Sequence, residues 1–454
     1  MNKLTPQIIA EVTGGQYIGE DSARDDRVAG AAHDDREVRQ GNLFVCISGK
    51  KVDGHSFANR AFEAGAACCL AEHHIEGAKG PYVLVNSTQE SFMAIGAYYR
   101  SLFSIPFIGL TGSVGKTTAK ELVAAALGGK FNVLKTNENK NNEIGVPLTL
   151  LSLEDNHEAA VIEMGIRDFG DMSLLAKMVR PDIFIMTKIG YSHLKELGDL
   201  HGVLKAKTEA FAYMKPDGVA VINGDDEFLW GYEPGMKRIT FGIGARNDFR
   251  AENIQAEGTD AVLCDVVSDT GRFPIRIPAY GTHLAPMALS AAAVGRLLGM
   301  EDEEISRGLL SYAPVGGRAN VTNTGAITLI DDCYNSNPNS VRAALSSLSS
   351  LHSRRVAILG DMKNLGVHAV PMHYEIGVCA AQNGVDRLIC CGPEALDIYK
   401  GYMSAGKGEA SYYATLEELM TSLPGMIEHG DAVLVKASRD LYFEKLLPLL
   451  RNII

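Results

Sequence analysis

The chain lacks several features that would place it in a membrane, in an oxidising compartment or on nucleic acid. Its 454 residues hold no apolar run long enough to cross a bilayer, and residues 1–14 are polar where a secretory leader has an apolar centre. Its eight cysteines form no Cys-x-x-Cys pair, which favours buried apolar roles over zinc or disulfide bonding. Basic residues are too few for general nucleic-acid binding, because the formal net charge is −12. We therefore expect a cytoplasmic protein of about three domains with no nucleic-acid partner and no membrane span.

One stretch carries a specific chemical signal: Gly-Leu-Thr-Gly-Ser-Val-Gly-Lys-Thr-Thr at residues 109–118. A strand pattern precedes it and a helical pattern follows it, which is the order of a phosphate-binding loop. Backbone N–H groups and the positive helix end would hold phosphate, Lys116 would add a charge, and Thr117 would offer a hydroxyl to Mg2+. The first glycine stands one residue early for the usual motif, and a glycine turn without a ligand is the alternative. The residues predicted to bind the nucleotide here are Thr111, Gly112, Ser113, Val114, Gly115, Lys116, Thr117 and Thr118.

The pattern before residue 86 predicts a first α/β unit, with strands at 43–47 and 82–85 and a helix at 56–65. Two polar clusters in it, at 34–36 and 53–55, are either turns or binding residues on residue types alone.

The next unit continues from the phosphate loop with a polar loop at 137–147. Strands at 159–162 and 183–187 end in Glu163 and in a loop that carries His193. In a parallel sheet, ligands bind beyond the carboxyl ends of the strands, where a carboxylate next to a phosphate loop is an expected Mg2+ ligand. A single histidine carries less information, and Lys207 alone indicates a solvated basic helix.

The remainder of this unit is expected to contain a strand at 218–222, a run of β-hairpins over 238–280, and helices at 285–298 and 302–310. From about residue 313, strands alternate with helices in the manner of a second doubly wound α/β domain, without a phosphate loop of its own. Its strands are predicted at 327–330, 355–359, 387–391 and 432–436, and its last helix at 440–450.

Taken together, these stretches resemble the Mur ligases of peptidoglycan synthesis. The resemblance rests on the glycine loop, 141–151, Glu163-Met164-Gly165, Ser192-His193 and Tyr334-Asn335-Ser336-Asn337-Pro338, with further agreement at 53–55, 359–362 and 436–439. It implies an α/β, three-domain architecture with a central P-loop ATPase domain and a C-terminal Rossmann-like domain. The implied boundaries are 1–85 for a UDP-substrate domain, 86–312 for the ATP domain and 313–454 for the C-terminal domain.

Within the family, the Tyr-Asn-Ser-Asn-Pro and Asn-Asn-Glu-Ile-Gly stretches are similar to the member that joins D-alanyl-D-alanine to UDP-N-acetylmuramoyl-tripeptide. That resemblance implies ATP and Mg2+, an acyl-phosphate intermediate and a monomer. The implied catalytic residues are Lys116, Glu163, His193 and Lys207. The implied metal ligands are Thr117, Glu163, His193 and Lys207, the last as a carbamate derived from CO2.

The resemblance also implies contacts outside the glycine loop. Further ATP contacts would come from Asn142, Arg318, Asn335 and Asn337. Substrate contacts would come from Asp35, Arg36, Asp53, His55, Lys436 and Arg439.

The chain departs from the family pattern at several of these places. Asp35 adds a carboxylate where serine is usual, Lys140 replaces an aromatic residue, and Lys188 stands where asparagine is common. Met287 takes the place of an asparagine that contacts adenine, and Ala437 replaces a glycine. Two alternatives stay open: a related ligase with another amino acceptor, and a non-catalytic protein that binds nucleotide.

Overall fold

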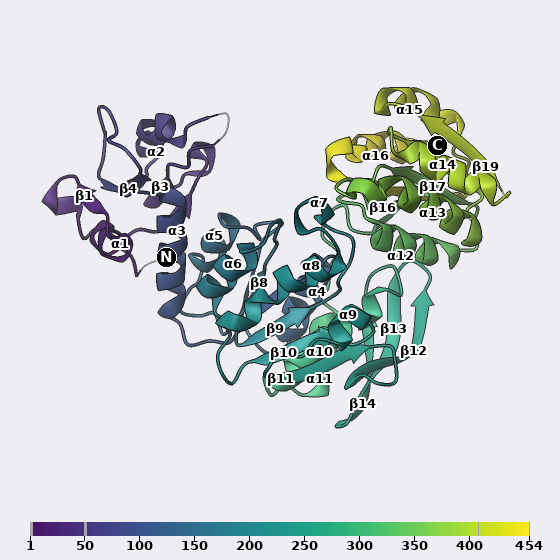
Figure 1. The fold of residues 1–454 in the computed structure, drawn as a ribbon, viewed down its shortest axis with the longest axis horizontal. Helices are drawn as coiled ribbons and strands as arrows, with labels where there is room; N and C mark the ends of the chain where they lie inside the picture. Colours follow the sequence, from purple (N-terminus) through teal and green to yellow (C-terminus); the bar gives the residue numbers. More distant parts are fainter. Residues whose placement is uncertain (1–2, 50–51, 407, 454) are drawn as a thin grey trace. The chain divides into compact units, whose positions relative to one another are not determined.

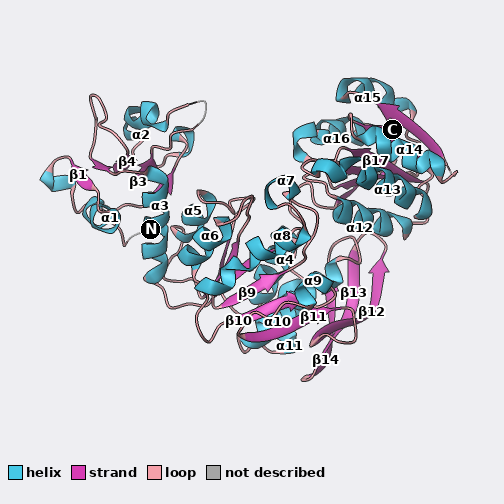
Figure 2. Cartoon of the chain, viewed as in Figure 1, coloured by secondary structure: helices cyan, strands magenta, loops and turns pink. Residues whose placement is uncertain are grey.

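A computed structural model describes residues 3–49, 52–406 and 408–453 (Figure 1). The chain divides into two compact units, the first made of 1–111, 131–184 and 208–219, and the second of 112–130, 185–207 and 220–454. The strands form three sheets accompanied by helices (Figure 2), which confirms the predicted α/β class. Among the described residues, no helix has both the length and the apolar character that a membrane crossing requires.

The first sheet has five short strands in the order β1-β5-β4-β3-β2. All neighbours pair in parallel except β1 and β5. Phe44, Cys69 and Tyr82 pack in its core. All eight cysteines of the chain are free and only Cys379 is less than fully buried, which confirms their predicted apolar role. The elements are α1 (Pro6–Thr13), β1 (Gln16–Ile18), β2 (Gly30–Ala32), β3 (Asn42–Val45), α2 (Ala58–Glu63), β4 (Cys68–Ala71) and β5 (Tyr82–Leu84).

The second sheet has nine strands in the order β14-β13-β12-β11-β10-β9-β6-β8-β7. Strands β6 and β8 pair in parallel, and Leu110 lies opposite Glu163. The strands are β6 (Phe107–Thr111), β7 (Val133–Lys135), β8 (Ala159–Glu163), β9 (Ile183–Met186), β10 (Val219–Asn223), β11 (Lys237–Gly242), β12 (Phe249–Glu257), β13 (Ala261–Ser268) and β14 (Gly271–Ile277). The helices are α3 (Thr88–Ser101), α4 (Lys116–Leu127), α5 (Gly145–Leu150), α6 (Asp171–Val179), α7 (Leu194–Leu197), α8 (Leu200–Thr208), α9 (Glu227–Trp230), α10 (Leu284–Leu297) and α11 (Asp302–Leu309).

The polar loop predicted at 137–147 is shorter than expected. Its last three residues begin α5, and Val146 is fully buried. Pro147 sits in the first turn of that helix, where the missing N–H group breaks no intrahelical hydrogen bond. Glycine and proline, which usually indicate a loop, therefore stand in the first turn of a helix here.

The predicted run of hairpins holds for β12, β13 and β14, which pair antiparallel. It is wrong for β11 and β12, which pair in parallel. The Asp225 carboxylate accepts hydrogen bonds from the N–H groups of Ile243 (2.6 Å) and Gly244 (2.9 Å) and from the Asn247 amide (2.8 Å). These bonds hold the connection as a curled loop, so that β12 runs in the same direction as β11.

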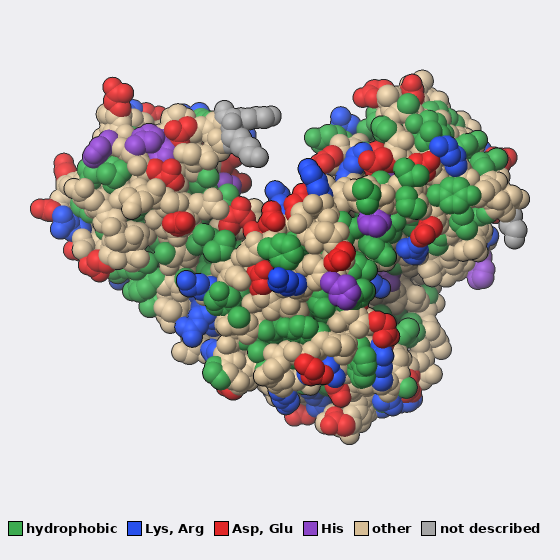
Figure 3. Space-filling model, viewed as in Figure 1, with side chains coloured by type: hydrophobic (Ala, Val, Ile, Leu, Met, Phe, Trp, Pro, Cys, Tyr) green, Lys and Arg blue, Asp and Glu red, His purple; other side chains and the backbone are tan. Residues whose placement is uncertain are grey.

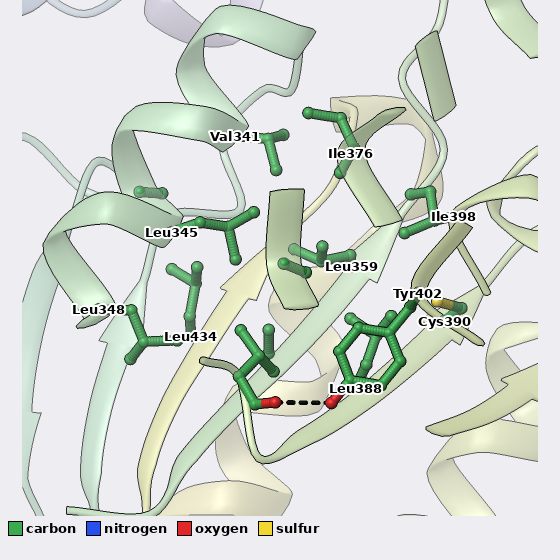
Figure 4. Packing of buried hydrophobic residues seen from close by; sticks show 14 of the residues in the cluster. Val341, Leu345, Leu348, Leu359, Ile376, Leu388, Cys390, Ile398, Tyr402 and Leu434 are labelled. Carbon is green, nitrogen blue, oxygen red and sulfur yellow. Dashed lines mark hydrogen bonds between the residues drawn. The ribbon is translucent and has the colours of Figure 1, made fainter. Parts of the chain in front are cut away.

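The third sheet has the order β15-β16-β20-β17-β18-β19, and only β15 runs antiparallel to its neighbour. Helices cover both faces, with α12, α13 and α14 packed in one core cluster and α15 and α16 in another, which confirms the doubly wound prediction. In the first cluster the Tyr402 hydroxyl donates a hydrogen bond of 2.6 Å to the Val385 carbonyl (Figure 4). The elements are β15 (Asn320–Asn323), β16 (Thr328–Asp331), α12 (Pro338–Ser349), β17 (Arg355–Gly360), α13 (Ala369–Gln382), β18 (Arg387–Cys391), α14 (Ala395–Ser404), β19 (Glu409–Tyr413), α15 (Leu416–Ser422), β20 (Ala432–Lys436) and α16 (Leu447–Arg451).

The predicted helix at 440–450 is wrong over most of its length. Residues 439–441 and 443–446 form two short 3-10 turns, and α16 begins only at Leu447. Tyr442 between the turns has a φ of 54°, in the left-handed region, which no α-helix can continue through.

Acidic and basic side chains are interspersed on the face shown in Figure 3. This mixture agrees with a chain in which 55 acidic residues exceed 43 basic ones. An anionic substrate therefore requires basic groups gathered locally.

Candidate active site

The glycine loop of the second unit has a backbone that only glycine can form at two positions. A Cβ atom on Gly112 would lie 1.9 Å from Thr187 Oγ1, and Gly115 has a φ of 82°. The Lys116 side chain curls back over the loop, because its ammonium donates to the Gly112 carbonyl at 2.8 Å. The first turn of α4 follows directly, so its unsatisfied N–H groups face the loop. This geometry is that of a phosphate cradle, and it fits a nucleotide triphosphate.

The loop after β9 holds the glycine loop in place. Ser113 donates from its N–H group to the Lys188 carbonyl (2.8 Å) and from its hydroxyl to the Gly190 carbonyl (3.0 Å). The buried Thr187 hydroxyl donates to the Val114 carbonyl at 2.6 Å. The sequence does not identify Thr187 as part of the loop's support, since nothing in its residue type indicates this contact. The Lys188 side chain is exposed, so this departure from the family pattern lies on the surface.

Lys207 lies on α8 and is almost fully buried, with 2% of its surface exposed. Burial lowers the pKa of its ammonium well below the ordinary value, and the charge of Lys116 lowers that pKa further. Both lysines belong to the second unit. The amine of Lys207 therefore loses its proton more readily than that of an exposed lysine, and its burial overturns the solvated basic helix that its residue type alone indicates. In the same unit, His193 precedes α7 and is half-buried, with a φ of 54°.

Glu163 ends β8 in the first unit and is 1% exposed. Its carboxylate accepts a hydrogen bond from the Asn141 amide at 2.9 Å, and its N–H group donates to the Thr136 hydroxyl at 3.0 Å. These contacts fix the side chain before any ligand arrives. A fixed, buried carboxylate at a strand end is suited to hold a divalent cation.

Three of the predicted nucleotide contacts have structural partners within their own unit. The Thr111 hydroxyl donates to the Met164 carbonyl at 2.8 Å. Asn142 accepts hydrogen bonds from the N–H groups that open α5, and Asn337 accepts one from the Ser340 N–H group at the start of α12. Thr117 and Thr118 lie in the first turn of α4, and Thr117 is 2% exposed.

The predicted substrate residues of the C-terminal part differ in accessibility. Lys436 is 2% exposed, and its ammonium lies 2.6 Å from the Asp332 carboxylate and 3.0 Å from the Asn335 carbonyl. Arg439 is exposed and pairs at 3.4 Å with Glu444. Arg439 is therefore the one of the two predicted cations that can meet a substrate carboxylate without losing a buried ion pair.

Arg318 lies over the ring of Tyr334, 4.2 Å from its centre. From the sequence alone, Tyr334 is only one residue of the Tyr-Asn-Ser-Asn-Pro motif. Asn335, the next residue, is exposed, as a nucleotide contact requires.

The predicted uridine-nucleotide residues of the first unit are held by ion pairs. Arg36 donates to Asp34 at 2.9 Å, and these bonds hold the pKa of the Asp34 carboxyl well below its usual range. The extra carboxylate of Asp35 lies 2.9 Å from Arg60, so its charge is compensated within the same cluster. The Arg36 side chain is largely exposed.

Asp53, His55 and His73 form a group with metal-ligand spacing. His55 uses one ring nitrogen to accept from the Glu72 N–H group at 2.8 Å and the other to contact Asp53 at 2.6 Å. The hydrogen bond from His55 holds the pKa of the Asp53 carboxyl well below its usual range. With both nitrogens engaged, His55 has no lone pair for a metal, so the group does not fit a metal site.

Met287 lies on α10 beside the glycine loop. A Cβ atom on Gly115 would come within 3.1 Å of its sulfur. Met287, at the predicted adenine-contacting position, therefore lies next to the glycine loop and offers it an apolar side chain.

Comparison with known proteins places these features in a family. Three family models match: "Mur ligase family, catalytic domain" over residues 27–95, "Mur ligase middle domain" over 110–295 and "Mur ligase, glutamate ligase domain" over 317–439. The chain is 32% identical to the UDP-N-acetylmuramoyl-tripeptide--D-alanyl-D-alanine ligase of Bacillus subtilis, over 98% of both chains. It is also 32% identical to the ligase of that name from Escherichia coli, over 100% of this chain and 99% of the relative.

Solved structures of Mur ligases are also similar to this chain. MurF from Acinetobacter baumannii has a TM-score of 0.89 with 28% identity over 98% of both chains. MurF ligase from Thermotoga maritima in complex with ADP has a TM-score of 0.82 with 28% identity, covering 95% of this chain and 98% of that one. The likeness extends from one end of the sequence to the other, with a three-domain arrangement. The chain therefore belongs to the Mur ligase family.

Proposed function

We propose that the chain joins D-alanyl-D-alanine to UDP-N-acetylmuramoyl-tripeptide with hydrolysis of ATP to ADP and phosphate, in peptidoglycan synthesis. The observation that carries the proposal is a chain that matches ligases of this name along its whole length and has a phosphate loop closed around glycines that admit no side chain. A carboxylate is a poor acyl donor, so amide formation requires its activation. The reaction places the enzyme in the cytoplasm, where ATP and the UDP-linked substrate are found, and we expect a monomer.

The reaction balances in two steps. An oxygen of the tripeptide's terminal carboxylate attacks the γ-phosphorus of ATP, the bond to the bridging oxygen breaks, and ADP leaves. The amine of D-alanyl-D-alanine then attacks the acyl carbon of the acyl phosphate and loses a proton, and phosphate leaves with the carbon–oxygen electron pair. Both steps concentrate negative oxygens, so cationic groups placed in advance lower the barrier.

The chain supplies such groups. Lys116, folded over the glycine loop, is positioned to neutralise the β- and γ-phosphates. Arg318 and the exposed Asn335 are assigned to the nucleotide, together with Asn142 and Asn337. Arg439 is assigned to the tripeptide's carboxylates, while the ion pair with Asp332 gives Lys436 the role of supporting the Asn335 loop.

Magnesium, when bound, would neutralise phosphate charge and orient the transferred group. We assign its ligands to Thr117, Glu163, His193 and Lys207. A neutral lysine amine attacks CO2 to give a carbamate and one proton, which converts Lys207 into an anionic oxygen ligand. The low pKa of Lys207 and the nearby cation of Lys116 both favour that anion.

The assignment of domains remains a proposal with the boundaries 1–85, 86–312 and 313–454. We assign the UDP end of the substrate to the first, through Asp35, Arg36, Asp53 and His55. The exposed Arg36 is the member of this set with the chemistry to meet a phosphate.

The test is the dependence of ATP turnover on both substrates. Phosphate release is expected to rise by about a hundredfold or more only when UDP-N-acetylmuramoyl-tripeptide and D-alanyl-D-alanine are both present, because acyl transfer completes the cycle. A panel of amino acids and dipeptides serves as the control for the acceptor. Rapid ATP hydrolysis that ignores both substrates would contradict the proposal, and preference for another acceptor would identify a different ligase of the family.

A further inference from the structure

The Tyr334 ring contacts two cations that belong to different parts of the proposed site. The Arg318 guanidinium lies 4.2 Å from the ring centre and the Arg439 guanidinium 5.6 Å from it. An aromatic face attracts a guanidinium through its negative quadrupole. One ring thus contacts both the arginine assigned to the nucleotide and the arginine assigned to the peptide.

Backbone contacts join Tyr334 to the segment that carries Arg318. The Tyr334 N–H group donates to the Gly317 carbonyl at 2.9 Å. Gly317 has a φ of 70°, and a Cβ atom there would lie 3.0 Å from the Cβ atom of Tyr334. The segment that carries Arg318 therefore packs directly on the backbone and Cβ atom from which the Tyr334 ring projects.

The Tyr334 ring is the main contact of the Arg318 guanidinium. Within the described ranges 3–49, 52–406 and 408–453, Arg318 forms no ion pair, whereas Arg439 also pairs with Glu444. Over the same ranges the Tyr334 hydroxyl has no recorded hydrogen bond. The structure thus uses the aromatic face of this residue and not its hydroxyl.

We propose that Tyr334 is a positioning residue that sets Arg318 for the nucleotide and Arg439 for the peptide carboxylate at the same time. The inference rests on the proposed function, since that function assigns the two arginines their ligands. Two guanidiniums near one another repel, and the negative quadrupole of the ring that both contact offsets that repulsion without presenting a carboxylate that would compete with the anionic substrates.

Replacing the ring is expected to affect both substrates. Tyr334→Leu should raise the KM for ATP and the KM for UDP-N-acetylmuramoyl-tripeptide by about fivefold each, with kcat changed by less than about twofold. Tyr334→Phe should match the wild-type enzyme in all three constants, because it keeps the ring. Steady-state kinetics with each substrate varied in turn provides the measurement.

Double variants separate positioning from a general structural defect. In an Arg318→Ala background, Tyr334→Leu should no longer raise the KM for ATP but should still raise the KM for the UDP substrate. In an Arg439→Ala background, the pattern should reverse. A loosened fold would instead worsen both constants in both backgrounds.

Tyr17→Leu is the matched control. Tyr17 is also half-buried and lies 4.9 Å from the Arg24 guanidinium, in a part of the chain with no assigned contact to ATP. It should leave both KM values unchanged. If Tyr334→Leu does not fold, as judged by thermal unfolding, Tyr334→Met carries the same expectation with a flexible side chain.

The inference is overturned if Tyr334→Leu leaves both KM values at wild-type levels, or if Tyr334→Phe is as impaired as Tyr334→Leu. Wild-type turnover measured in parallel distinguishes failure of the proposed role of the ring from failure of the proposed function. An active wild-type enzyme with an indifferent Tyr334→Leu contradicts only the role of the ring. A wild-type protein that does not ligate contradicts the proposed function and, with it, this inference.

Discussion

Lys207→Ala is expected to lower ligation by about a thousandfold or more, because it removes the carbamate assigned as a ligand of the Mg2+ that would neutralise the developing phosphate charge. Wild-type activity should fall when CO2 is stripped from the buffer and return when bicarbonate is added. The variant's residual activity should ignore bicarbonate. Phosphate release measured in degassed and bicarbonate-supplemented buffer checks both statements.

The pH dependence of this effect has a definite sign. Carbamate formation consumes the neutral amine and releases a proton, so falling pH opposes it. Burial and Lys116 lower the pKa of Lys207, which keeps the amine neutral at lower pH than in an exposed lysine. The concentration of dissolved CO2 that restores half of the activity should therefore rise as the pH is lowered.

The matched control for this prediction is Lys205→Ala. Lys205 lies on the same helix α8 but is exposed, and it should keep both the activity and the response to bicarbonate. Full activity in Lys207→Ala, or equal loss in the two variants, would contradict the carbamate assignment.

Lys116→Ala is expected to abolish ligation, with a loss of about a thousandfold or more, because it removes the cation that is folded over the glycine loop. Binding of UDP-N-acetylmuramoyl-tripeptide should stay within about twofold of wild type, since the uridine end is assigned to a different domain. Calorimetric titration of the UDP substrate, beside the turnover assay, makes the comparison.

Lys130→Ala is the control for Lys116→Ala. Lys130 follows α4 and pairs with Glu304 at 3.1 Å, away from the glycine loop at the other end of the helix. It should lose no ligation activity. If Lys116→Ala lost the UDP substrate as well as turnover, the assigned division of labour between the domains would be wrong.

The sequence was sufficient to predict an element where its local residue pattern and its chemistry indicate the same structure. The order of strand, glycine loop and helix around 109–118 was predictable, because the loop requires glycine at positions where a side chain would collide or strain the backbone. The alternating strands and helices after residue 313 were equally predictable, since buried parallel strands such as β17 and β20 are continuous apolar runs. The buried, unbonded state of the cysteines could be predicted from their number and spacing alone.

Short edge strands were not predictable, because they carry little apolar pattern. Strand β15, with the sequence Asn-Val-Thr-Asn, and strand β19, which is only half-buried or exposed, form the two edges of the third sheet. Their pairing is decided by the neighbouring strand and not by their own residues.

Contacts between distant residues were also beyond the sequence. Lys436 was assigned to a substrate carboxylate, yet it pairs with Asp332, which lies 104 residues earlier. Tyr334 belongs to a recognisable motif, but only the fold shows that two arginines contact its ring. In both cases the residue type allows several roles, and only the folded arrangement selects among them.

The central claim is that the tripeptide's carboxylate is activated by transfer of phosphate from ATP. The most direct measurement uses UDP-N-acetylmuramoyl-tripeptide labelled with oxygen-18 in both oxygens of the carboxylate that forms the new amide. The account predicts one labelled oxygen in each phosphate released during ligation, because the carboxylate oxygen that attacks phosphorus leaves with it. Ligation that releases unlabelled phosphate would contradict the account.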